Sequence, residues 1–121
     1  MDPAQLLIAA GLVLLAVAAL LGFMQEHHRE RPEQFAQWRV VHAGGTAGAV
    51  QLLALAAIWP QLADRGLASL LLAGAMIAVA YAFFLGPLAR VLGQSRIART
   101  FNVAGALLAV PTYVALPLAL L

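Results

Sequence analysis

Long apolar segments occupy most of this sequence, and they constrain its fold more strongly than any other feature. They are rich in Leu, Ala and Val and cover residues 4–24, 39–59, 67–92 and 101–121. A helix needs about 20 mostly apolar residues to cross the hydrocarbon core of a bilayer. Each segment is therefore predicted to form one transmembrane helix.

The composition indicates that lipid is the main solvent of this chain. Hydrophobic residues make up 64% of it and charged residues 10%, whereas a soluble domain is roughly half apolar and a quarter charged. We therefore predict an all-α fold, an integral membrane four-helix bundle that forms a single transmembrane domain over residues 1–121. The first apolar run lacks a preceding basic segment and a convincing cleavage site, so it is interpreted as a retained span and not a signal peptide.

The arginines predict how the spans are oriented. Six of the seven lie in or beside the first and third connections, and only Arg65 lies in the second. Because cytoplasmic loops carry an excess of Arg and Lys, these two connections are expected in the cytoplasm and both termini on the non-cytoplasmic side. We expect the inner, cytoplasmic membrane of a bacterium and no binding to nucleic acid. The six arginines are Arg29, Arg31, Arg39, Arg90, Arg96 and Arg99.

His42 is the leading candidate for a functional residue. Apart from arginines near span ends and two tyrosines, it is the one ionisable side chain inside a predicted span, and such groups usually face a neighbouring helix, a cavity or a cofactor. Trp38 lies four residues earlier on the same helical face, and that face continues with the small side chains of Gly45, Thr46 and Ala49. Since imidazole is a common axial ligand of haem iron, a flat ligand is predicted to lie against this face.

A purely structural interpretation of the same span stays open. His42 lies about one turn inside the membrane and can reach the interface, while Gly44 and Gly48 have the spacing of an ordinary contact between membrane helices. His27 and His28 are adjacent in a charged connection, where solvation is commoner than metal binding.

Tyr81 and Asn102 are further candidates. Tyr81 lies deep in the third span, so its phenol needs an acceptor, either on a substrate or on another helix. Asn102 lies near the start of the fourth span, in the same leaflet as His42 by the orientation above, and is the polar residue best placed to meet it. The spans contain no acidic residue and no serine nucleophile motif, which disfavours hydrolases and proton pumps.

Residues 38–49 and 56–62 carry a family resemblance. They resemble small four-span membrane proteins of the hydroxylaminobenzene mutase and styrene oxide isomerase type, in which a His near the start of the second span is followed by a glycine three residues on and commonly by an Asn-Gly pair. His42 and Gly45 match this pattern. Gly48 and Ala49 stand where the Asn-Gly pair is expected, so the amide of that pair is missing.

The resemblance implies a cofactor, an assembly and a reaction. By resemblance, His42 is the axial ligand of haem b, and the protein is a homotrimer with haem between its subunits. The ferric iron of that haem acts as a Lewis acid. Tyr81 is similar in type and approximate place to a tyrosine that those isomerases use. The first hypothesis is a membrane-embedded, haem-dependent isomerase or mutase that rearranges a small hydrophobic aromatic epoxide or hydroxylamine, with Tyr81 or Asn102 orienting the substrate oxygen. The alternatives are a non-catalytic haem protein for electron transfer or sensing, and a cofactor-free scaffold or transporter subunit.

Overall fold

The computed structural model describes the backbone of all 121 residues and every side chain except that of Ala119. The described residues form helices and no strand. Four of the helices are long and apolar enough to cross a membrane, which confirms the predicted all-α fold with four spans. The helices are α1 (Pro3–His27), α2 (Pro32–Ala57), the short α3 (Trp59–Asp64), α4 (Leu70–Val91) and α5 (Ser95–Leu120).

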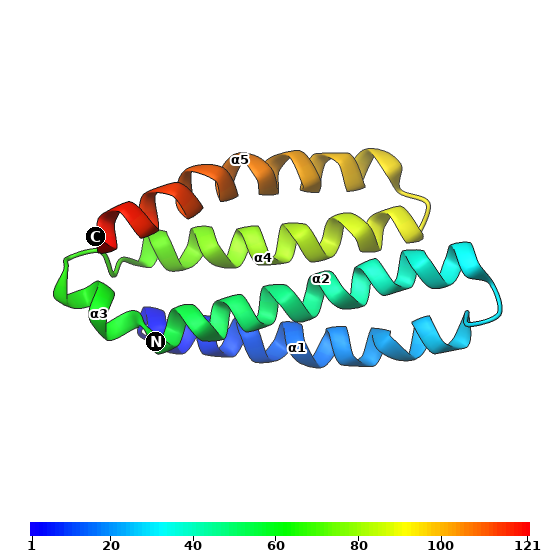
Figure 1. Cartoon of the computed structure of the whole chain (residues 1–121), viewed down its shortest axis with the longest axis horizontal. Coiled ribbons are helices and arrows are strands. Elements are labelled where there is room, and N and C mark those ends of the chain that lie inside the picture. Colours follow the sequence, from blue (N-terminus) through cyan, green and yellow to red (C-terminus); the bar gives the residue numbers. More distant parts are fainter.

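The four long helices form two hairpins that lie side by side, with α2 and α4 in the middle (Figure 1). α1 packs on α2 and also touches α4, whereas α5 packs chiefly on α4. Both termini and α3 lie at one end of the bundle, and the connections at 28–31 and 92–94 lie at the other end. The termini thus share one end, as predicted; the side of the membrane that this end occupies stays a prediction from the arginines.

Two helices begin earlier than the apolar runs predict. α2 begins at Pro32 and not at residue 39, so residues 32–37 form its first turns. α5 begins at Ser95 and not at residue 101. A 26-residue helix is about 39 Å long, against about 30 Å for the hydrocarbon core. The polar turns are therefore parts of the helices that reach beyond the hydrocarbon.

The connection between α2 and α4 also differs from the prediction. Trp59 was expected at the end of the second span, but α2 ends at Ala57 and Trp59 begins α3 as a buried residue. Pro60 gives the reason, because proline has no N–H to donate to the Ala56 carbonyl and its ring clashes with that carbonyl, whereas proline is well tolerated in the first turn of a new helix. The third span begins at Leu70 and not at residue 67, because the Ser69 hydroxyl caps α4 by accepting the Leu72 N–H at 3.1 Å.

Small residues on α2 bring α1 and α4 close to it on two sides. A Cβ atom at Gly45 would lie 2.7 Å from Cβ of Ala18 on α1 and 2.9 Å from the ring of Phe84 on α4. A Cβ atom at Gly48 would lie 3.2 Å from Leu14 and 3.3 Å from Ala80. Close approach at small residues is how membrane helices gain van der Waals contact without a hydrophobic driving force between them. The three-helix contact therefore centres on α2.

Pro87 shapes the contact between α2 and α4. Proline has no N–H, so the Phe83 carbonyl lacks the helical donor that residue 87 would otherwise provide. Gly44 lies against that carbonyl, since a Cβ atom there would come within 3.2 Å of the oxygen. The backbone of α2 thus approaches α4 where α4 has a free acceptor, and the predicted packing role of Gly44 and Gly48 is confirmed.

We predict that Gly45→Ala destabilises the bundle. The added methyl would overlap Ala18, whose Cβ is fixed to the backbone, so the helices must separate; overpacking of this kind typically costs about 1–3 kcal/mol. The loss is measured by thermal unfolding of the protein in mild detergent. Gly74→Ala is the matched control, because a Cβ atom there meets nothing within 4 Å. Equal melting temperatures for the two variants would contradict the prediction.

Candidate functional site

The His42 side chain lies between α1 and α2. Its Nδ1 atom is 2.7 Å from the carbonyl oxygen of Ala18, and the side chain is half-buried. A carbonyl oxygen can only accept, so Nδ1 carries the proton and donates. The neutral ring then has its lone pair on Nε2. The geometry therefore presents Nε2 as the nitrogen able to bind a metal.

Gly22 makes room for the imidazole on α1. A Cβ atom at Gly22 would lie 3.2 Å from both Cε1 and Nδ1 of His42, which is closer than an ordinary van der Waals contact. The Gly22 N–H donates to the same Ala18 carbonyl within the helix, because residues four apart are bonded in an α-helix. A bare Cα at position 22 thus leaves one face of that carbonyl open to a side chain from α2.

The face of α2 beside His42 is largely covered within one chain. Trp38 is 8% exposed and Ala49 is fully buried, and Gly45 is enclosed by α1 and α4 as described above. The Thr46 hydroxyl donates to the His42 carbonyl at 2.9 Å. The predicted shared face exists, but its small side chains serve helix packing here. Their assignment as contacts of a bound ligand stays a prediction.

Trp38 also connects the site to the first connection. Its ring stacks on His28, with 6.1 Å between ring centroids and 22° between planes, and Nδ1 of His28 lies 2.7 Å from the Met24 carbonyl. Among the described residues, no group of three or more His, Cys, Asp or Glu side chains is placed to hold a metal ion. His28 is therefore half-buried and links the end of α1 to Trp38 of α2, and is not simply solvated as the sequence favoured.

Tyr81 lies away from His42 in the single chain. Its hydroxyl donates to the Ala10 carbonyl at 3.0 Å and so joins α4 to α1. Ala10 and Ala18 are eight residues apart on α1, which corresponds to about 12 Å along the helix axis. The acceptor that the sequence demanded for this phenol is thus a helix backbone, and a substrate-orienting role for Tyr81 stays a prediction.

Asn102 lies on the opposite side of α2 from His42. Its side-chain oxygen sits against Gly86 of α4, where a Cβ atom would overlap it, and it lines a cavity of ≈ 370 Å³ together with Val40. Val40 precedes His42 by two residues, and two residues turn a helix by about 200°. The structure therefore does not bring Asn102 to His42 within one chain.

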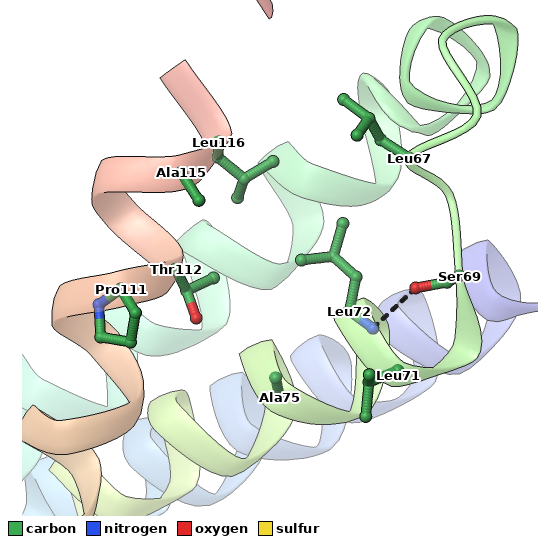
Figure 2. Close-up of a pocket in the computed structure, with 9 residues that line it drawn as sticks. All are labelled: Leu67, Ser69, Leu71, Leu72, Ala75, Pro111, Thr112, Ala115 and Leu116. Carbon is green, nitrogen blue, oxygen red and sulfur yellow. Dashed lines mark hydrogen bonds between the residues drawn. The ribbon is translucent and has the colours of Figure 1, made fainter. Parts of the chain in front are cut away.

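A second cavity lies at the end of the bundle that holds the termini. It has a volume of ≈ 350 Å³ and lies between the start of α4 and the C-terminal part of α5 (Figure 2). Its two hydroxyls already bond to backbone, since Ser69 caps α4 and Thr112 donates to the Leu108 carbonyl at 2.7 Å. The remaining lining side chains are apolar. This cavity has the chemistry of a surface for acyl chains and not of a catalytic site.

The chain was compared with known protein families, curated proteins and solved structures. The model of the styrene oxide isomerase family matches residues 3–121, nearly the whole chain. The chain belongs to the styrene oxide isomerase family. No curated protein and no solved structure is significantly similar to it. The resemblance carried by His42 and Gly45 is thereby confirmed, and membership indicates a membrane protein of the isomerase type.

Sequence reasoning missed two residues of this styrene oxide isomerase family member that position its histidine. The Ala18 carbonyl carries no sequence signal, because every residue has one. Gly22 carries a weak signal, since a glycine within an apolar span often marks close approach of another helix. Which side chain approaches it depends on the register between α1 and α2, and that register is a tertiary property.

We predict that the neutral form of His42 in this family member carries its proton on Nδ1, and that Gly22→Val weakens the bond from Nδ1 to the Ala18 carbonyl. The larger side chain would press on the imidazole and lengthen the bond to Ala18. Nitrogen-15 NMR of histidine-labelled protein distinguishes the tautomers, and a weaker bond should speed hydrogen exchange at Nδ1. Ala19→Val, at an exposed position of the same helix, should leave the His42 signals unchanged. A proton on Nε2 in the unchanged protein would contradict the assignment.

Proposed function

We propose that this protein is a haem-dependent isomerase that rearranges a small hydrophobic aromatic epoxide or hydroxylamine within the membrane. The observation that carries the proposal is the 2.7 Å bond between His42 Nδ1 and the Ala18 carbonyl. A metal-binding histidine almost always donates its other ring nitrogen to such an acceptor, which fixes the tautomer and raises the basicity of the binding nitrogen. Family membership supports the isomerase class of reaction.

Among the residues present, His42 fits a protein ligand of a haem iron. His42 would hold the iron through Nε2, and when bound the haem would supply a Lewis acid that polarises the substrate oxygen. The covered face around Gly45 and Ala49 leaves no enclosing pocket for a porphyrin in one chain. The proposal therefore includes a homo-oligomer, a trimer by the family resemblance, in which a second copy of the chain covers the open side of His42.

The apolar surroundings of His42 would direct the reaction towards rearrangement. An aryl epoxide that opens develops positive charge on its benzylic carbon, and water would trap that carbon as a diol. Membrane helices exclude water, so migration of a hydride to the carbon, which yields the carbonyl isomer, has no competing nucleophile. The reaction is redox-neutral and needs no second reactant. Water exclusion is thus the contribution of the chain's own side chains.

Tyr81 enters the proposal as the side chain that orients the substrate oxygen. Because its hydroxyl lies about 12 Å along α1 from the His42 contact in one chain, it would reach a substrate from the second copy. The proposal does not use Asn102, whose position opposite His42 connects it with a different cavity, discussed in the next subsection.

Visible absorption spectra of detergent-purified protein, produced with adequate haem supply, test the ligand. We expect a Soret band of near-stoichiometric intensity that disappears in His42→Ala. His28→Ala is the matched control, since its Nδ1 also bonds to a helix carbonyl but the residue lies in the connection at 28–31. It should keep the haem. A colourless, well-folded wild-type protein, or a normal haem content in His42→Ala, would overturn the proposal.

Turnover of styrene oxide by haem-loaded protein tests Tyr81. Tyr81→Phe should reduce kcat by about 100-fold, the usual loss for a missing hydrogen-bond donor to a developing oxyanion. Loss of the bond to Ala10 should lower stability by only about 0.6 kcal/mol. Tyr113→Phe, an exposed phenol on α5, should retain full turnover. If Tyr81→Phe loses only stability, its phenol serves helix packing alone.

A further inference from the structure

The cavity that contains Asn102 lies between α2, α4 and α5, near the connections at 28–31 and 92–94. Its volume is ≈ 370 Å³, and it combines apolar walls with one cation and two amides. It belongs to neither the His42 contact nor the cavity of Figure 2. Its lining residues are Ala36, Gln37, Val40, Pro87, Arg90, Val91 and Asn102.

The polar and apolar groups of this cavity are placed at different depths. Arg90 lies in the last turn of α4 and Gln37 in the second turn of α2, so both are near helix ends. Val40 and Pro87 lie about one turn deeper in their helices, since each turn rises about 5.4 Å. α2 exceeds the hydrocarbon thickness by about 9 Å, which places its first turns at headgroup depth. The cavity thus runs from the headgroup region into the hydrocarbon.

Arg90 has no anionic partner within 4.0 Å among the side chains that the structure describes. Among the described side chains, the ion pair within 4.0 Å joins Arg29 to Glu26 in the first connection. Glu33, one turn further out on α2 than Gln37, is exposed and does not line the cavity. Arg90 therefore offers an uncompensated positive charge beside amide groups, at the end of the bundle that holds six of the seven arginines.

We propose that this cavity binds one anionic phospholipid. Its phosphate would lie against Arg90 and the Gln37 amide, and the start of an acyl chain would fill the space beside Val40 and Pro87. Basic pockets between membrane helices bind anionic headgroups in this way. A neutral partner protein would leave the charge of Arg90 unmatched, and a soluble anion would leave the apolar part of the cavity empty. Asn102 then forms part of the wall of a lipid site and not of the His42 site.

Native mass spectrometry of the full chain, titrated with phosphatidylglycerol or with phosphatidylcholine of the same acyl chains, tests the proposal without any substitution. Phosphatidylglycerol should bind about fivefold more tightly, the effect expected of one cation near the surface. Millimolar inorganic phosphate should not compete, because it lacks the acyl chains. Equal affinities for the two lipids, or displacement of the lipid by inorganic phosphate, would overturn the proposal.

Two pairs of variants locate the site. Arg90→Gln should remove the preference for phosphatidylglycerol, whereas Arg96→Gln, an exposed arginine at the same end of the bundle, should retain it. Ala36→Leu should weaken the binding of both lipids, because the larger side chain fills the cavity. Ala43→Leu, at an exposed position of the same helix outside the cavity, should leave the binding of both lipids unchanged. An equal effect of Arg90→Gln and Arg96→Gln would indicate a general surface charge and would contradict the proposed site.

Discussion

The close approach of α1 and α4 to α2 is the contact on which the rest of the structure depends. Membrane helices gain no hydrophobic free energy by leaving lipid for one another, so the contact relies on shape. Gly45 and Gly48 provide that shape by removing the side chains that would hold the backbones apart. The same approach sets the distance at which His42 meets the Ala18 carbonyl. Packing and the candidate site therefore share one constraint.

The sequence predicted the spans because the physical demand on them is local. A run of about 20 apolar residues satisfies the bilayer whatever its neighbours do, so the existence of four spans followed without tertiary information. The boundaries did not follow in the same way. Residues 32–37 are polar but continue α2, because helix formation extends beyond the hydrocarbon, and Pro60 ends α2 before the apolar run ends.

For the candidate site, the sequence predicted which side chains need a polar partner but not where those partners lie. Residue type showed that His42 and Tyr81 each need a partner in lipid, and both have one. The identity of these two hydrogen-bond partners could not be predicted. Both are backbone carbonyls of α1, and which carbonyl each side chain meets depends on the register of α1 against α2 and α4. Spacing also placed Trp38, Gly45 and Ala49 on one face correctly, but could not show that α1 and α4 cover it.

The Ala18 carbonyl accepts two hydrogen bonds, one from the Gly22 N–H within α1 and one from His42. Because the carbonyl is shared, the position of α1 affects the strength of the hydrogen bond from the imidazole. If α1 slides or rotates slightly against α2, the bond to Nδ1 lengthens, the ring loses electron density, and Nε2 becomes a weaker donor to a metal. If a haem is bound as proposed, the position of α1 would thereby set how strongly Nε2 donates to the iron, and a change in lipid thickness or a neighbouring subunit that moves α1 would change that strength.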